Sequence, residues 1–175
     1  YQWLTVPVKS KGKYHQKFKD VEIDLENKNY NNISKIIRFN YQSSPYFKDL
    51  FIDIEGILEK KNKFLIDLNV ALIKKICNFL KIEKEFVFSS SFNLSSKKSQ
   101  LLFDLTKAVN GTVYLSAPGS AVFFEEHNPF LMSKIELKYH EYFCKNYNQR
   151  TTDFLSYCSI IDMIFNIGKE AENFI

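Results

Sequence analysis

Residues 99–120 read SQLLFDLTKAVNGTVYLSAPGS, and this stretch decides the fold class. Its apolar residues recur at the spacing of a helix with one buried face, so the sequence predicts a helix over residues 99–109. Asn110-Gly111 then supplies the helix end, because both residues tolerate the left-handed backbone. Residues 112–116 predict a strand, and residues 117–120 predict a loop at its carboxyl end.

The residues before this stretch extend the pattern toward a parallel sheet. A short strand is predicted at residues 86–88, so the order along the chain is strand, helix, strand. A connection of this kind is right-handed and joins parallel strands. We therefore predict an α/β fold, a single domain over residues 1–175 in which helices pack on a mixed or mainly parallel sheet.

Hydrophobic periodicity predicts the other elements. The predicted strands, of which the first is weakened by a proline at position 7, span residues 3–9, 21–24 and 135–141. Two helices are predicted over residues 31–40 and 45–59. A third begins at Asp67 or Asn69, and its buried face is Leu72, Ile73, Ile76, Cys77 and Leu80.

Residues 159–168, SIIDMIFNIG, predict the last helix with both of its ends. Ser159 and Asp162 have the spacing of a capping box, in which each side chain accepts a hydrogen bond from the other residue's amide. Gly168 supplies the exit with positive φ.

The composition is that of a folded chain with a mild positive charge. A hydrophobic share of 45% and an aromatic share of 16% exclude a disordered chain. The net charge of +4 permits an anionic ligand such as a nucleotide sugar, but it is too small to indicate a nucleic-acid-binding protein. Lys9, Lys11 and Lys13 would hold phosphates, and the alternative for them is a solvated surface.

The cysteines and the first residues of the chain indicate in which cellular compartment the protein is expected. Three widely spaced cysteines form neither a disulfide framework nor a zinc signature, and reduced thiols in the cytoplasm fit best. No apolar run approaches the roughly 20 residues that a membrane span requires. The chain opens without Met inside a predicted strand, so we expect a segment before it, and a removed targeting segment stays open.

Three residues are the catalytic candidates. Cys144 stands in an irregular polar segment, and a nucleophilic role there requires a nearby base and a lowered pKa. His140 is four residues away, although the strand pattern turns it toward solvent. Asp162 is a candidate general base, against the alternative that helix capping alone explains it.

Two loops are the further candidates for substrate binding. Ser116, Pro118 and Gly119 follow a strand at the end where α/β sheets bind ligands, and the alternative is a plain tight turn. Tyr147 and Gln149 are polar residues in a long irregular segment with no other evident duty.

The sequence shows no motif for a cofactor or a metal, and we expect neither. Pro118-Gly119-Ser120 has one glycine, so it is not a dinucleotide fingerprint, a P-loop or a nucleophile elbow. Glu125-Glu126-His127 lacks a second histidine at helical spacing, and a solvated helix end explains it better.

The order of these short segments is more specific than any one of them. They are Trp3-Leu4-Thr5-Val6-Pro7-Val8-Lys9, Lys11-Gly12-Lys13, Gln16-Lys17, Asn40-Tyr41, Pro45-Tyr46-Phe47, Lys97-Lys98-Ser99, Leu101-Leu102, Tyr114-Leu115-Ser116, Pro118-Gly119, Tyr147 with Gln149, Ser159-Ile160-Ile161-Asp162, Phe165-Asn166 and Gly168. In this order and spacing the chain resembles the WbqC-like family, which is found with bacterial surface-polysaccharide gene clusters.

The chain departs from the family's pattern at several positions. Cys144-Lys145 stands where a His-Pro pair is usual, Leu101 where an arginine is common, and Ala117 where a glycine is common. The family usually begins with a further segment that carries a Gln-Pro-x-Tyr motif. We therefore expect a WbqC-like domain that lacks an N-terminal segment of the family.

The resemblance implies a role in O-antigen or capsule assembly, with transfer of glycine or another acyl group to an amino sugar. We expect a cytoplasmic transferase that acts on a nucleotide-linked or lipid-linked sugar, with the Pro118-Gly119 amides as oxyanion donors. The alternative is a non-catalytic sugar-binding or scaffold protein. It would contact the polysaccharide assembly enzymes through exposed rings such as Tyr14, Tyr142 or Tyr147.

Overall fold

The computed structural model describes residues 3–175 and contains two compact units. Unit 1 comprises the residues up to Glu83 together with Cys144–Ile175, and unit 2 comprises Lys84–Phe143. Helices and a pair of parallel strands confirm the predicted α/β class. The single domain over residues 1–175 stays a prediction, and each unit is described separately.

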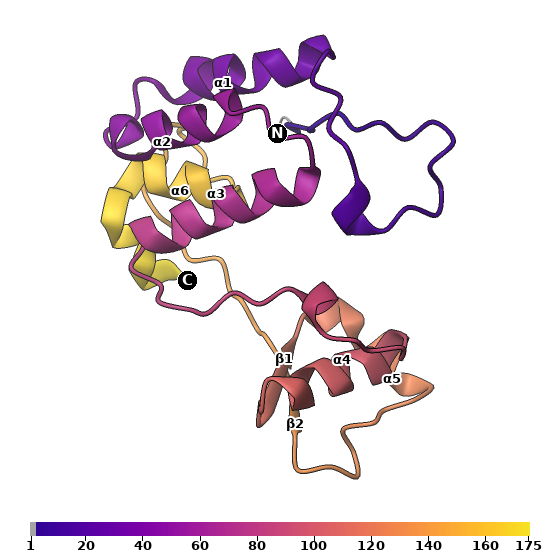
Figure 1. The fold of residues 1–175 in the computed structure, drawn as a ribbon. Helices are drawn as coiled ribbons and strands as arrows, with labels where there is room; N and C mark the ends of the chain where they lie inside the picture. Colours follow the sequence, from indigo (N-terminus) through magenta and orange to yellow (C-terminus); the bar gives the residue numbers. More distant parts are fainter. Residues whose placement is uncertain (1–2) are drawn as a thin grey trace. The chain divides into compact units, whose positions relative to one another are not determined.

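Unit 1 is built from helices. They are α1 (Lys28–Tyr41), α2 (Phe47–Glu59), α3 (Leu65–Phe79) and α6 (Ile160–Ile167), and a 3-10 turn over Gly168–Phe174 follows the last of them. Helix α2 contacts α1, α3 and α6 (Figure 1). The predicted helices at 31–40 and 45–59 are confirmed. Helix α1 begins at Lys28, earlier than predicted. Asn27 caps this end, because its side chain accepts a hydrogen bond from the Asn29 amide at 3.0 Å.

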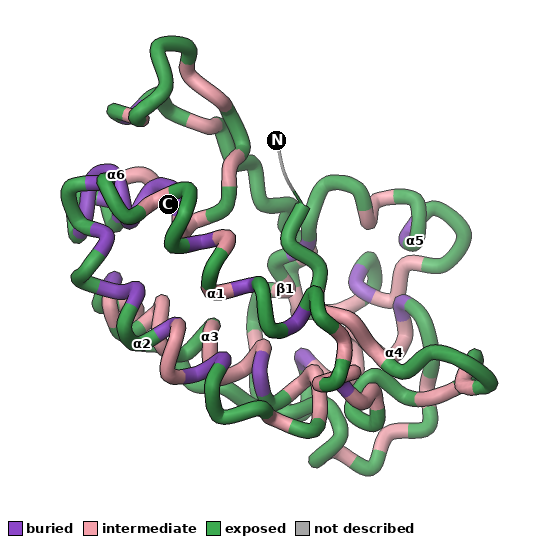
Figure 2. The backbone as a smooth tube through the Cα atoms, turned by 90° about the horizontal axis from the view of Figure 1, so that it is seen from above, coloured by how far each residue is buried: buried purple, intermediate pink, exposed green. Residues whose placement is uncertain are grey.

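The core of unit 1 is apolar and lies between these helices. Its most deeply buried large side chains are Leu50, Phe51, Leu68, Ile164 and Phe165. Figure 2 shows buried residues along α2 and α6. The predicted inner face of α3 is wrong at Ile73, which is 49% exposed. Helix α3 begins at Leu65, before the predicted start, and its fully buried residue is Leu68. The face of the helix that packs against the core therefore does not include Ile73.

Helix α6 is enclosed on all sides, since every residue from Asp162 to Ile167 is buried. The predicted capping box is wrong, because the Ser159 side chain makes no cap hydrogen bond. The Asp162 amide instead donates to the Ser159 backbone carbonyl at 2.9 Å. The predicted exit is confirmed: Gly168 has φ of 63°, and a Cβ there would lie 2.6 Å from Cδ1 of Tyr46.

The predicted strands at residues 3–9 and 21–24 are wrong. The structure has only isolated antiparallel bridges there, Val8 with Ile23 and Glu22 with Phe64. Pro7 has no amide hydrogen, so it cannot donate a hydrogen bond that would extend the Val8–Ile23 bridge into a ladder. After this bridge the chain continues directly into a long loop. Trp3 is 92% exposed.

Unit 2 contains the parallel strands. In chain order its elements are α4 (Lys98–Ala108), β1 (Val113–Ser116), α5 (Val122–Glu125) and β2 (Glu136–Tyr139), with short 3-10 turns at Ser89–Ser91 and Pro118–Ser120. Strand β1 pairs in parallel with β2, and the register runs from Val113 opposite Glu136 to Ser116 opposite Tyr139.

The predicted strand at residues 86–88 is wrong, and so is the crossover that depended on it. Phe86, Val87 and Phe88 are between 41% and 54% exposed, and a three-residue run offers too few ladder hydrogen bonds to hold a strand without burial. The partner of β1 is β2, so the connection between the parallel strands passes through α5.

Aromatic rings form the small core of unit 2. The ring of Phe130 lies 5.3 Å from those of Phe103 and Tyr114 and 5.7 Å from that of Phe124. Phe124 and Phe130 are buried. These contacts hold α4, α5 and the following loop against β1.

Candidate functional site

The register of the parallel strands gathers four of the predicted site residues at one edge of unit 2. Ser116 ends β1 opposite Tyr139, which ends β2, so residues 117–119 and His140 leave the sheet at the same carboxyl edge. The His140 amide donates to the Ser116 carbonyl at 2.8 Å and continues the ladder by one bond. Ligands of parallel α/β sheets bind at this edge.

The turn after β1 is closed by its own hydrogen bonds. The Ser120 amide donates to the Ala117 carbonyl at 3.0 Å, and the Ala121 amide donates to the Pro118 carbonyl at 3.1 Å. The hydroxyls of Ser116 and Ser120 also bond to each other. Pro118 has no amide hydrogen, and a Cβ on Gly119 would meet nothing within 4 Å. Gly119 is therefore the residue of this turn that a ligand can approach closely.

His140 is exposed, as its place in the strand pattern predicts. Its ring centroid lies 6.4 Å from that of Tyr142, with the planes 11° apart. An exposed imidazole at this edge is available to a bound ligand as a hydrogen-bonding group.

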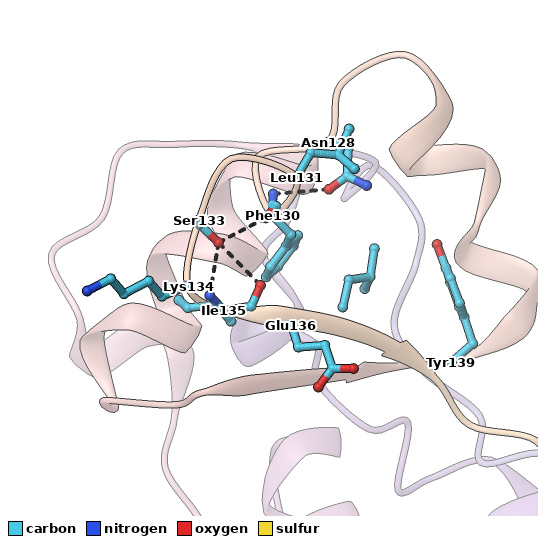
Figure 3. Close-up of a pocket in the computed structure, with 9 residues that line it drawn as sticks. Asn128, Phe130, Leu131, Ser133, Lys134, Ile135, Glu136 and Tyr139 are labelled. Atoms are coloured by element: carbon cyan, nitrogen blue, oxygen red, sulfur yellow. Dashed lines mark hydrogen bonds between the residues drawn. The ribbon is translucent and has the colours of Figure 1, made fainter.

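A cavity of about 440 Å³ lies beside β2 in the same unit (Figure 3). Its wall combines apolar and polar side chains: Asn128, Phe130, Leu131, Ser133, Lys134, Ile135, Glu136, Leu137 and Tyr139. Figure 3 shows Ser133 and Lys134 on one side of the lining and Tyr139 on the other. Ser133 is held in place because its hydroxyl donates to the Phe130 carbonyl and accepts from the Ile135 amide, both at 3.0 Å. No residue motif signalled this cavity, because it depends on a loop folding back onto the strand.

The predicted lysines lie in unit 1, where two of them surround one carboxylate. Lys9 and Lys13 each place Nζ 3.8 Å from Oε2 of Glu22, and Lys63 places its Nζ 3.7 Å from Oε1. We call Lys9, Lys13, Lys63 and Glu22 the lysine cluster. Lys63 could not be found from the sequence, because the Glu22–Phe64 bridge brings it there. Lys11 is exposed in the turn between Lys9 and Lys13.

Three ammonium groups around one carboxylate leave an excess of two positive charges. Each lysine pairs only loosely, at 3.7 to 3.8 Å, and the three repel one another. A second anion, such as a phosphate, would relieve that repulsion.

A buried polar network in unit 1 joins three further predicted residues. Oδ2 of Asp162 accepts hydrogen bonds from the Tyr147 hydroxyl at 2.6 Å and from Nε2 of Gln149 at 3.0 Å. The Gln149 side chain also donates to the Leu155 carbonyl at 2.9 Å and accepts from the Leu155 amide at 2.7 Å. The negative charge of Asp162 also acts on the phenol of Tyr41, which belongs to α1. Asp162 and Tyr147 are at most 9% exposed, so the network ties the segment around residue 150 to α6.

The network keeps its phenols and its nearest thiol protonated. Burial, reinforced by the hydrogen bond to Asp162, raises the pKa of Tyr147 far above its ordinary value. Burial and the negative charge of Asp162 raise the pKa of Tyr41 in the same way. Burial, and then the Asp162 charge, raise the pKa of the Cys158 thiol. These groups are poor nucleophiles at neutral pH, because the protonated form dominates.

Cys144 belongs to the same unit as this network. Its Sγ accepts a hydrogen bond from the Tyr157 amide at 3.4 Å, and the residue is partly buried. Cys144 and Asp162 lie in unit 1, whereas His140 lies in unit 2. The predicted pairing of Cys144 with His140 therefore stays a prediction.

Sequence reasoning missed one serine–histidine contact. Oγ of Ser99 lies 3.2 Å from Nδ1 of His127, which connects the start of α4 to the residues after α5. Ser99 is only 4% exposed, so a substrate has no access to its hydroxyl and the contact holds two elements together.

Two kinds of feature are absent from residues 3–175. Over residues 3–175, no three His, Cys, Asp or Glu side chains are grouped in a way that could hold a metal ion. In the same range, no helix is both long and apolar enough to cross a membrane.

Comparison with known proteins places the chain in a family. The model of the WbqC-like protein family matches residues 1–174. An uncharacterized protein of Mycobacterium tuberculosis strain H37Rv, Rv1507c, is 30% identical over 176 aligned residues, which cover 99% of this chain and 75% of that protein. No solved structure matches the chain. The chain belongs to the WbqC-like protein family.

Proposed function

We propose that the protein is a cytoplasmic transferase of bacterial surface-polysaccharide assembly, in the O-antigen or capsule. Its substrate is a nucleotide-linked or lipid-linked amino sugar, and it transfers glycine or another acyl group to the sugar amine. The observation that carries the proposal is the shared carboxyl edge of β1 and β2, where the turn that contains Gly119 and the residue His140 both leave the sheet. Family membership supports the context, since the resemblance connects WbqC-like proteins with polysaccharide gene clusters.

The cavity beside β2 supports the sugar-binding part of the proposal. At about 440 Å³ it falls in the size range of small-molecule sites, and Tyr139 connects its wall directly to His140. An aromatic ring with a nearby amide and charged groups matches a sugar, which has apolar C–H faces and polar hydroxyl edges.

Unit 1 has a candidate anion site of its own, since the lysine cluster supports binding of a phosphate group. Lys9 and Lys13 were predicted for this role, and Lys63 adds a third ammonium group beside Glu22. Lysine ammonium groups bind phosphate oxygens as point charges and need no fixed fork geometry. Lys11, between the two predicted lysines, adds positive charge to the same turn.

Acyl transfer requires a base and a donor for the oxyanion. In the proposed reaction the sugar amine attacks an activated carbonyl, a C–N bond forms, and the bond to the leaving group breaks. His140 takes the proton from the amine and passes it to the leaving group, while the Gly119 amide stabilises the oxyanion. Cys144 stays an alternative nucleophile. Asp162 is the weaker base candidate, because its carboxylate already accepts hydrogen bonds from Tyr147 and Gln149.

Binding is tested by saturation-transfer NMR with a UDP-linked amino sugar. We expect binding by the parent chain and a dissociation constant at least about tenfold weaker for K9A/K13A/K63A. The matched control K35A/K48A/K60A removes three exposed lysines, one from α1, one from α2 and one at the C-cap of α2, and should bind like the parent. Equal weakening in both variants, or no binding by the parent, would contradict the phosphate-binding role.

Turnover is tested by mass spectrometry of the amino sugar after incubation with aminoacyl and acyl thioester donors. We expect His140→Gln to lower turnover about a hundredfold while sugar binding is unchanged, because a general base contributes about that much. Normal turnover by this variant, together with loss of activity in Cys144→Ser, would move the chemistry to unit 1.

A second candidate function is a non-catalytic sugar-binding or scaffold protein of the same pathway. The protonated phenols and the enclosed carboxylate of the polar network favour it, because they indicate a structural role for Asp162. Tyr147 is buried and cannot be the exposed ring that was predicted to contact a partner, whereas Tyr14 is 97% exposed. Stable binding of assembly enzymes without turnover would support this candidate.

A further inference from the structure

Residues 9–20 form a strongly cationic loop of unit 1 that contains exposed aromatic rings. The loop reads KSKGKYHQKFKD and has five lysines at positions 9, 11, 13, 17 and 19. Tyr14 is 97% exposed and Phe18 is 57% exposed. We call these residues the cationic loop. Figure 1 shows it extending away from the helices of unit 1.

The cationic loop has a defined backbone conformation. The Lys9 amide donates to the Glu22 carbonyl at 2.9 Å, and the Val8–Ile23 bridge closes the loop at its base. The Lys13 amide donates to the Ser10 carbonyl at 3.1 Å, with Gly12 at φ of 74°. A 3-10 turn over Phe18–Asp20 ends the loop. Because the rings are held outward by ordered turns, no large ordering cost opposes their transfer to another surface.

The combination of residue types indicates the kind of surface. Lysines extend their charges to an anionic surface while their methylene chains lie along it, and aromatic rings favour the boundary between water and lipid. Each lysine near an anionic bilayer contributes favourable free energy that salt weakens. Trp3, which leads into the loop and is 92% exposed, adds a third ring of the same kind.

We propose that the cationic loop docks the protein on the surface of a bilayer that contains anionic lipids, with Tyr14 and Phe18 entering the headgroup region. This site goes beyond the proposed sugar chemistry and does not depend on it. A nucleic acid is the weaker partner, because the net charge of the whole chain is only +4.

Co-sedimentation of the full chain with large unilamellar vesicles tests the proposal. We expect binding to phosphatidylcholine vesicles that contain phosphatidylglycerol, and little binding to phosphatidylcholine alone. Raising the salt concentration from about 0.05 M to about 0.5 M should reduce binding, because the shorter Debye length screens the lysines. The vesicles carry no sugar, so failure of vesicle binding can be distinguished from failure of nucleotide-sugar binding.

Two loop variants and one control separate docking from general charge. We expect Y14S/F18S to lower the partition coefficient about tenfold, because the rings no longer enter the lipid boundary. K17Q/K19Q removes two lysines that lie outside the lysine cluster, and we expect a similar tenfold loss. K35Q/K48Q removes the same charge from α1 and α2 and should stay within about twofold of the parent. Circular dichroism confirms that each variant is folded.

Three outcomes would overturn the proposal. The first is equal loss of binding in K17Q/K19Q and K35Q/K48Q, which would show that net charge alone attracts the chain. The second is no sedimentation with anionic vesicles at low salt. The third is binding of a single-stranded oligonucleotide that is tighter than vesicle binding and equally sensitive to Y14S/F18S, which would assign the loop to nucleic acid.

Discussion

Asp162 shows at the scale of single residues how a role depends on partners that are distant in the sequence. Its position at the start of α6 predicted a cap, but its carboxylate accepts hydrogen bonds from side chains 13 and 15 residues away. Local spacing cannot contain that information. Tyr147 and Gln149 were predicted as ligand contacts because no structural duty was evident, and the network gives them one.

We predict that Tyr147→Phe destabilises the protein by about 2 kcal/mol. The variant keeps the ring but removes the hydroxyl that donates to Asp162 at 2.6 Å, so a buried carboxylate loses one donor. Urea unfolding followed by far-UV circular dichroism measures the change. Tyr14→Phe is the matched control, since its hydroxyl is exposed, and it should change the free energy of unfolding by less than about 0.5 kcal/mol. A silent Tyr147→Phe would show that the network has no stabilising role.

The same phenols predict a loss of stability in alkali. Because the folded state raises the pKa of Tyr41 and Tyr147, it holds protons that the unfolded chain releases above pH of about 10. The stabilisation is complete below that pH and declines as the pH rises, by up to about 1.4 kcal/mol per pH unit for each phenol. The thiol of Cys158, with its raised pKa, begins to contribute at somewhat lower pH.

Unfolding experiments between pH 8 and pH 11 (roughly the range in which Cys and Tyr titrate) check the sign. The free energy of unfolding of the parent should fall more steeply above pH of about 10 than that of Y41F/Y147F. Parallel curves for the two proteins would mean that neither phenol is held protonated by folding.

At the scale of elements, the backbone after α6 offers a sharp comparison between two glycines. Gly168 has φ of 63°, and a Cβ there would lie 2.6 Å from the Tyr46 ring, whereas a Cβ on Gly56 inside α2 would meet nothing within 4 Å. We predict that Gly168→Ala destabilises by more than about 2 kcal/mol, through strain and overlap together. Gly56→Ala should stabilise by about 0.5 to 1 kcal/mol, because alanine is the better helix former.

Thermal and urea unfolding of both glycine variants give these values. If the two substitutions shift stability in the same direction, then the exit of α6 does not require the conformation seen at Gly168. Tyr46→Ala combined with Gly168→Ala would relieve the overlap and leave only the backbone strain.

Helices and strands differed in how far the sequence predicted them. The helices α1, α2, α3 and α4 follow from apolar residues at helical spacing, a local property that the structure retains. The strands at residues 3–9 and 86–88 were wrong because a strand depends on a partner elsewhere in the chain. Residues 135–141 predicted β2 correctly, yet its pairing with β1 was not foreseen.

At the scale of the whole chain, the two units differ in how much apolar surface they bury. The large core between the helices lies entirely in unit 1, and the buried apolar residues of unit 2 are Phe124 and Phe130. We predict that amides of α4, β1 and β2 exchange with deuterium at least about tenfold faster than those of α2 and α6, because local opening exposes less apolar surface there. Mass spectrometry of peptides after timed labelling measures this, and equal protection in both units would contradict it.

The family model covers both units, although no site residue could be assigned from the family's chemistry. The sequence placed Ser116, Pro118, Gly119 and His140 near strand ends, and the parallel register brings them to one edge. The lysine cluster was predicted in part, since Lys63 joins it only through a bridge between distant segments. The sequence therefore predicted which residues lie at the strand ends, but it missed Lys63, which depends on a long-range contact, and the role of the strand-end residues stays a prediction.

The exposure of Trp3 has a practical consequence for spectroscopy. It is the only tryptophan of the chain, and at 92% exposure its indole is surrounded by water in the native protein as it is in the denatured one. Intrinsic emission excited at the indole band will therefore stay nearly constant while either unit loses its structure. Ten tyrosines, among them the enclosed Tyr30 and Tyr147, carry the optical signal of the native state instead.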